Sequence, residues 1–105
     1  YPYVTSSHTI AGYAAVSSGI PSKMMNTVIG VMKAYTTRVG KGPMPTELLS
    51  GLGESIRQKG HEYGATTGRP RRVGWLDLPL LKYSAEVNGI DEIVITKIEV
   101  LSVLN

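Results

Sequence analysis

The sequence has no cysteine and no long apolar run. Without cysteine there is no disulfide framework, no thiolate nucleophile and no cysteine-based metal site. No apolar run approaches the ~18 residues of a membrane-spanning helix, and no stretch resembles a signal peptide. These absences disfavour a disulfide-rich domain and a membrane span, and they are compatible with a reducing, cytosolic setting.

Recognisable catalytic motifs are also scarce. The segment at residues 40–47 holds glycine, lysine and proline, but it lacks the glycine-to-Gly-Lys-Ser/Thr spacing of a phosphate-binding P-loop. The only histidines are His8 and His61, and neither has a partner at the spacing of metal ligands. We interpret His61 as structural, and we assign the chain no catalytic residue and no metal ligand.

The chain does have the composition of one ordinary globular domain. It has 105 residues, of which 42% are hydrophobic and 18% charged. Its net charge of +3 is mild and favours a local site for small anions over a broad nucleic-acid-binding face. The chain begins at Tyr1 and ends directly after the apolar residues 100–104, so we expect it to be an excerpt of a longer polypeptide.

Residues 64–74 are the most unusual stretch. They contain three glycines, two threonines and three arginines, with almost no apolar side chain to bury. Pro70 lacks an N–H and pushes the residue before it out of the helical region, so we expect an ordered loop and no helix. Side chains alternate along an extended backbone, which would place Arg69 and Arg71 on one face and Arg72 on the other.

These groups together predict an anion-binding loop. A guanidinium can hold a carboxylate or a phosphate with two parallel hydrogen bonds, and Thr66, Thr67 and the backbone near Gly68 add further donors. Two other interpretations stay open: a solvated turn, or a basic patch that attracts nucleic acid or a targeting receptor. The small residues favour the anion site, because they let a ligand approach the backbone closely.

The remaining pattern predicts the elements that surround this loop. We expect Asp77 to cap a helix that stops at Asn88 and Gly89, and Gly60 to end the helix before the loop. The expected elements are helices at 10–16, 53–59 and 78–87, a turn or short helix at 22–26, a helical start at 46–49, and buried strands at 28–39 and 92–96.

Two further sites are suggested at strand ends. Thr5 follows the apparent end of a strand, where its hydroxyl would either line a phosphate nest or cap the next helix. Lys97 and Glu99 lie two apart at the exit of the last strand and can project to one side. A carboxylate there can accept from N1 and the exocyclic amine of a guanine, while a lysine stem lies on the ring. An ordinary Lys-Glu surface pair is the alternative.

Several segments along the whole chain closely resemble adenylosuccinate synthetase. They are YPYVTSS (1–7), KAYTTRVG (33–40), GP (42–43), PTEL (45–48), GATTGRPRR (64–72), GWLD (74–77) and TKIEVL (96–101). That family is a ligase of purine nucleotide biosynthesis. It joins inosine monophosphate (IMP) to L-aspartate with GTP and Mg²⁺, giving adenylosuccinate, GDP and phosphate, the first committed step from IMP to AMP.

The resemblance implies roles for individual residues. Thr5 and Arg69 would bind IMP, and Arg71 would also contact GTP. The guanine-reading residues would be Lys97, Ile98 and Glu99. The aspartate-binding loop would comprise Ala65, Thr66, Thr67, Gly68, Arg69, Pro70 and Arg71.

The chain departs from the family pattern at two of these positions. Glu99 stands where the family usually has aspartate, which moves the acceptor pair by about one bond length. Pro70 stands where many relatives have arginine, which leaves fewer reaching cations and a stiffer loop. The family's catalytic aspartate and histidine, its glycine-rich phosphate loop and its Mg²⁺ ligands are expected outside this chain.

The resemblance also implies a fold and partners. We expect an α/β fold related to the P-loop NTPases, with a large central sheet flanked by helices, of which residues 1–105 form one partial domain. The complete enzyme would be a cytoplasmic homodimer with no nucleic-acid or membrane partner. The alternatives are a non-catalytic remnant that binds nucleotides or other anions, and a nucleic-acid module on residues 69–72 that binds duplexes in a salt-sensitive way.

Overall fold

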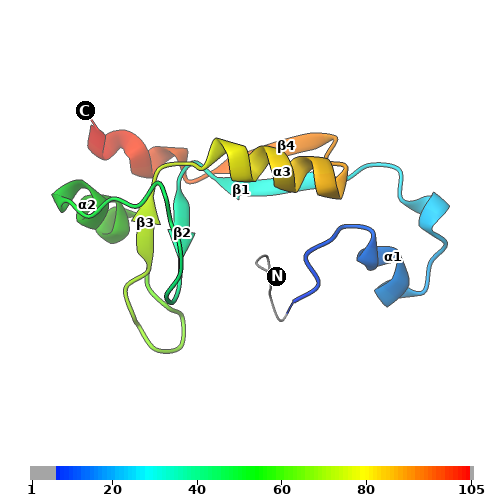
Figure 1. Cartoon of the computed structure of the whole chain (residues 1–105), viewed down its shortest axis with the longest axis horizontal. Helices are drawn as coiled ribbons and strands as arrows, with labels where there is room; N and C mark the ends of the chain where they lie inside the picture. Colours follow the sequence, from blue (N-terminus) through cyan, green and yellow to red (C-terminus); the bar gives the residue numbers. More distant parts are fainter. Residues whose placement is uncertain (1–6, 105) are drawn as a thin grey trace.

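A computed structural model describes residues 7–104, and Figure 1 shows their elements along an elongated body. Helices and strands are interspersed along the chain, as expected for an α/β fold. The 3₁₀ helices are η1 (Ser22–Met24) and η2 (Ile98–Leu104). The other elements are α1 (Tyr13–Ser18), β1 (Ile29–Lys33), β2 (Thr36–Arg38), α2 (Gly51–Gly60), β3 (Arg72–Gly74), α3 (Leu78–Asn88) and β4 (Glu92–Thr96).

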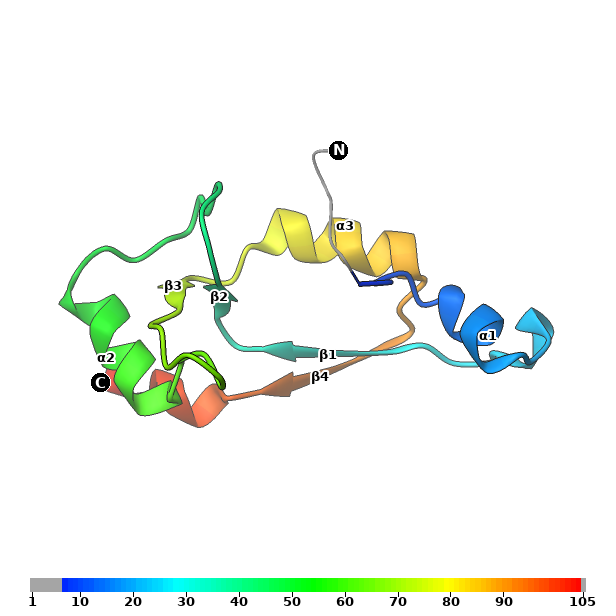
Figure 2. The same ribbon diagram turned by 90° about the horizontal axis from the view of Figure 1, so that it is seen from below.

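The strands form two small sheets. β1 and β4 pair in parallel, from Ile29 opposite Glu92 to Lys33 opposite Thr96. β2 and β3 pair antiparallel, and α3 runs alongside the parallel pair (Figures 1 and 2). Since β1 is followed at once by β2, the chain passes directly from the first sheet into the second.

The single buried strand expected at 28–39 is therefore wrong in two respects. The chain bends at Ala34 and Tyr35, which ends β1 and turns the Tyr35 side chain into the interior. The apolar side chains of β1 and β4 are also largely exposed, with Val31 71% and Ile95 49% accessible, because the described residues give this sheet little cover besides α3. β-branched composition predicts strand but does not by itself predict burial.

The helices differ from their predicted bounds at several ends. α1 begins at Tyr13 rather than residue 10, and it ends at Ser18, which Gly19 follows with φ 70°. α2 continues one residue past its predicted end, and His61 takes the left-handed conformation with φ 53°. A Cβ at Gly60 would collide with the Tyr35 hydroxyl, so glycine is needed there for space and not as the helix stop. The helical start expected at 46–49 is wrong, because Glu47 pairs with Gly74 as a β-bridge.

α3 confirms its predicted ends closely. The Asp77 side chain accepts a hydrogen bond from the Leu80 backbone N–H at 3.0 Å, as an N-cap should. Gly89 follows the helix in the left-handed conformation, with φ 60°. The helix extends to Asn88, one residue beyond the prediction.

A small core joins the second sheet to the helices at one end of the molecule. Tyr35, Ile56, Val73 and Val100 are buried, and they come from the β1–β2 bend, α2, β3 and η2. Leu48, Leu52, Leu101 and Val103 pack against them. This core fixes α2 relative to β3, and so it fixes both ends of the loop that connects them. Within residues 7–104, no helix is both long enough and apolar enough to cross a bilayer.

The Asp77 cap allows a stability test in the full polypeptide. Asp77→Ala removes the acceptor for the Leu80 N–H and should lower the free energy of unfolding by about 1 kcal/mol. Asp77→Asn keeps a side-chain oxygen and should stay near wild type. Urea unfolding measures both, and equal losses in the two variants would contradict a capping role.

Candidate functional site

The loop between α2 and β3 is closed by its own backbone. Gly64 N–H donates to the Arg69 carbonyl at 2.8 Å, and Gly68 N–H donates to the Gly64 carbonyl at 2.8 Å. Gly68 has φ 64°, a conformation that favours glycine. A bridge between Tyr63 and Pro70 pairs the two arms of the loop. The expectation of an ordered, non-helical loop is confirmed.

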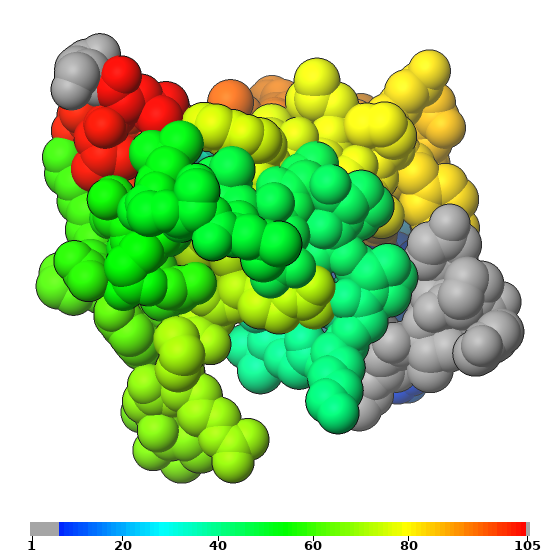
Figure 3. All heavy atoms as spheres, turned by 60° about the vertical axis from the view of Figure 1, so that its left-hand side comes forward, coloured from blue at the N-terminus to red at the C-terminus, as the bar shows by residue number. Residues whose placement is uncertain are grey.

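The far end of this loop projects from the body of the molecule. Figure 3 shows it as a yellow-green finger below the neighbouring elements. Residues 65–70 are all exposed. Among the described residues, Arg69 has no acidic side chain within ion-pair distance, and the Thr67 hydroxyl only receives a long contact of 3.5 Å from the Arg69 N–H. Of the groups predicted to capture an anion, Thr66, Thr67 and Arg69 are therefore exposed to solvent.

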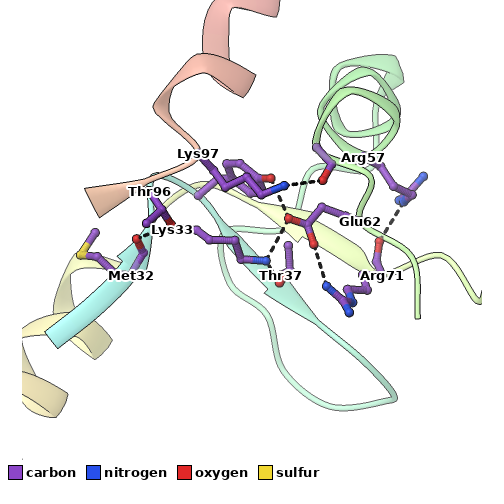
Figure 4. A network of polar contacts seen from close by, with 10 residues as sticks. Met32, Lys33, Thr37, Arg57, Glu62, Arg71, Thr96 and Lys97 are labelled. Atoms are coloured by element: carbon purple, nitrogen blue, oxygen red, sulfur yellow. Dashed lines mark hydrogen bonds and ion pairs between the residues drawn. The ribbon is translucent and has the colours of Figure 1, made fainter. Parts of the chain in front are cut away.

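The base of the loop contains a buried carboxylate. Glu62 is only 2% exposed, and three donors reach it (Figure 4). Lys33 Nζ donates to Oε1 at 3.0 Å and the Tyr35 hydroxyl to the same oxygen at 2.7 Å. Arg71 Nη1 donates to Oε2 at 3.0 Å. All of these bonds are charge-assisted, and a buried charge needs such partners.

Burial and hydrogen bonding oppose each other at Glu62. Burial alone would raise the pKa of the Glu62 carboxyl, but the hydrogen bonds from Tyr35, Lys33 and Arg71 outweigh it and hold that pKa below its usual range. Burial and the hydrogen bond to Glu62 raise the pKa of the Tyr35 phenol. Glu62 is thus ionised and Tyr35 protonated near neutral pH.

Arg71 is anchored at both its backbone and its side chain. Its N–H donates to the Glu62 carbonyl at 2.9 Å, and its carbonyl accepts from Arg57 Nε at 2.8 Å. The side chain keeps 32% of its surface exposed despite the ion pair with Glu62. Within the described part of the chain only Nη1 is engaged, so the other edge of the guanidinium is open to a ligand.

Arg72 binds other partners than Arg71 does. Its Nε and Nη2 hold the two Glu47 oxygens at 2.7 and 2.5 Å, and Nη1 donates to the carbonyls of Gly40 and Gly42. The bond from Arg72 lowers the pKa of the Glu47 carboxyl, and Glu47 raises the pKa of Arg72. The prediction that Arg72 points away from Arg71 agrees with these contacts. Its guanidinium ties residues 40–47 to β3.

The two guanidinium groups predicted to share one face have different surroundings. Arg69 is exposed at the loop, whereas Arg71 pairs with a buried acid at the loop's base. The physical reason is Glu62, whose buried charge needs a cation. Sequence reasoning missed Glu62, Lys33 and Tyr35 as parts of the site. The usable signal was an acidic residue directly before a loop rich in arginine.

The segment at residues 97–99 does not continue the strand. Lys97 has φ 63°, and η2 begins at Ile98. The alternation that would place Lys97 and Glu99 on one side of an extended strand is therefore wrong. Lys97 Nζ donates to the Gly60 carbonyl at 2.9 Å, which ties this segment to the end of α2. Ile98 and Glu99 are exposed.

The remaining candidates are placed as follows. Thr5 lies outside the described residues. His8 stacks on Tyr13 with ring centroids 3.7 Å apart, and His61 is the left-handed residue that follows α2. Within residues 7–104, no group of three His, Cys, Asp or Glu side chains is arranged to hold a metal ion.

Comparisons with known proteins agree on one family. The family model for adenylosuccinate synthetase matches residues 1–105. Adenylosuccinate synthetases from Caldicellulosiruptor bescii and Thermus thermophilus are 62% and 61% identical over 102 residues, which is 97% of this chain and 24% and 25% of their lengths. The chain thus spans about a quarter of these curated relatives.

A solved structure supports the same relation. The fully ligated adenylosuccinate synthetase from Plasmodium falciparum superposes with a TM-score of 0.88 at 55% identity. The superposition covers 96% of this chain and 24% of that one. The α/β fold predicted from the sequence is confirmed as part of that larger fold. On the family match along its full length, the chain belongs to the adenylosuccinate synthetase family.

Proposed function

We propose that this chain is the aspartate-, IMP- and guanine-binding portion of a GTP-dependent ligase that makes adenylosuccinate, GDP and phosphate. The activity belongs to the complete protein, because the chain spans about a quarter of its relatives' length. The observation that carries the proposal is the loop before β3, which exposes Thr66, Thr67 and Arg69 while Glu62 anchors Arg71 at its base.

The exposed end of the loop suits a small dicarboxylate. The guanidinium of Arg69 supplies a planar pair of donors, and the hydroxyls of Thr66 and Thr67 lie three and two residues away along the chain. Gly68 gives the backbone room for close approach. We assign residues 65–71 to L-aspartate, with Arg69 also reaching IMP. Thr5 is assigned to the IMP phosphate.

We assign Arg71 to the reacting phosphoryl group. In the proposed reaction the γ-phosphoryl group of GTP moves to the 6-oxygen of IMP. The aspartate amine then displaces that oxygen together with its phosphoryl group, as phosphate. Negative charge develops on phosphoryl oxygens in both steps, so a fixed cation stabilises them with little reorganisation. The open edge of the Arg71 guanidinium can serve this purpose because its other edge is held by Glu62.

The proposal also covers the guanine-binding residues, the metal ion and the form of the complete enzyme. Lys97, Ile98 and Glu99 are assigned to guanine, with the exposed Glu99 carboxylate accepting from N1 and the exocyclic amine. Mg²⁺ held by residues elsewhere in the complete enzyme would screen the charge of the phosphates. A homodimeric, cytoplasmic enzyme is the expected form.

Arg69→Ala in the full-length enzyme tests the aspartate site. Loss of two charge-assisted hydrogen bonds should raise the KM for aspartate roughly 10- to 100-fold. The melting temperature should stay near wild type, because Arg69 makes no ion pair within the described residues. Steady-state kinetics measure the effect, with Lys82→Ala as the control for loss of an exposed cation. An unchanged KM would remove Arg69 from the site.

Arg71→Ala tests the phosphoryl-transfer role. Removing a preorganised cation should lower kcat by about 100-fold or more. Arg71→Lys keeps a positive charge for Glu62 but loses the planar fork, so it should also be slow while its melting temperature stays closer to wild type. Wild-type kcat in both variants would contradict the assignment.

Glu99→Gln tests guanine recognition. The amide can accept only on its oxygen and turns a donor toward the base, so the KM for GTP should rise by roughly 10- to 100-fold, the range for a bidentate pair. Inosine triphosphate lacks the exocyclic amine. The factor by which its kcat/KM falls below that of GTP should therefore be smaller in the variant than in wild type. If the ratio of kcat/KM for the two nucleotides is unchanged, Glu99 does not read guanine.

A further inference from the structure

We propose that Glu62 is a positioning residue that sets the direction of the Arg71 guanidinium and so presents its open edge to substrate. This inference rests on the proposed role of Arg71 and deepens it. Glu62 itself lies too deep to touch substrate, being 2% exposed, whereas Arg71 keeps 32% of its side-chain surface accessible.

The two carboxylate oxygens of Glu62 accept from different donors. Oε1 accepts from both Lys33 Nζ and the Tyr35 hydroxyl, at 3.0 and 2.7 Å. Oε2 is left to Arg71 Nη1, at 3.0 Å, among the donors of residues 7–104. The first oxygen therefore fixes the carboxylate in the protein, and the second is a fixed acceptor for one edge of Arg71 (Figure 4).

The backbone reinforces this alignment. The Glu62 carbonyl accepts from the Arg71 N–H at 2.9 Å, so the two residues are joined by main-chain and side-chain bonds across the base of the loop. Arg57 Nε holds the Arg71 carbonyl from α2. With the backbone of Arg71 held from both sides, the direction of its side chain is decided mainly by the ion pair.

The charge on Glu62 is needed as well as its shape. Lys33 and Arg71 both approach the same carboxylate to 3.0 Å, so two cations share one anion. Replacing the carboxylate with a neutral amide would leave these cations facing each other and would offer one of them an N–H instead of an acceptor. Arg71 would then turn away from Glu62 toward solvent, and its catalytic edge would lose its fixed direction.

A double-mutant cycle in the full-length enzyme tests this inference. Glu62→Gln should lower kcat/KM for aspartate by about tenfold or more, as expected when a catalytic cation loses its preorganised position. In the Arg71→Ala background the same change should cost no more than about twofold, because nothing is left to position. Glu86→Gln, which neutralises an exposed carboxylate on α3, should leave kcat/KM unchanged.

The alternatives give different results. A purely structural Glu62 would lower kcat/KM by the same factor in both backgrounds, which would overturn the proposal. If Glu62→Gln fails to fold, Glu62→Asp replaces it, because this change keeps the charge but withdraws it from Arg71 by one methylene. It should lower kcat/KM for aspartate in the wild-type background and change it little in the Arg71→Ala background.

The cycle also separates this inference from the proposed function. Wild-type kcat/KM in Arg71→Ala would overturn both, since Arg71 would then have no role for Glu62 to support. A slow Arg71→Ala enzyme together with a fully active Glu62→Gln enzyme would overturn only the positioning role.

Discussion

The buried carboxylate of Glu62 is the constraint on which the rest of the site depends. It lies two residues beyond the end of α2, and it joins the end of β1, the bend that follows β1 and the arm before β3. A buried ion pair is seldom a large gain in stability, since desolvation offsets its attraction. Its effect here is on direction. Lys33 and Tyr35 hold the Glu62 carboxylate in place, and that carboxylate holds the Arg71 guanidinium at the base of an exposed loop.

The same end of α2 connects the two assigned ligand segments. Lys97 donates to the Gly60 carbonyl, and the Tyr35 hydroxyl occupies the space beside Gly60 while it binds Glu62. The residues assigned to guanine and the loop assigned to aspartate are therefore attached to one short stretch of backbone. Of the three arginines at 69–72, Arg72 ties residues 40–47 to β3, Arg71 is anchored with one edge open, and Arg69 is exposed.

Local rules predicted the parts of this structure that depend on neighbouring residues. The Asp77 cap, the Gly89 stop and the non-helical loop around Pro70 follow from backbone chemistry within a few positions. The bend at Tyr35 and the pairing of Glu62 with Lys33 depend on residues 27 and 29 positions apart, and no periodicity encodes them. Family resemblance assigned roles to the loop and to residues 97–99, but it did not point to the acid that anchors Arg71.

A crystal structure of the full-length enzyme with IMP, GDP and aspartate tests the central claim most directly. The account predicts that Arg69 holds a substrate carboxylate and that Arg71 keeps Nη1 on Glu62 while its open edge faces the ligands. A saturated complex in which residues 65–71 point into bulk solvent, with Arg71 detached from Glu62, would contradict it.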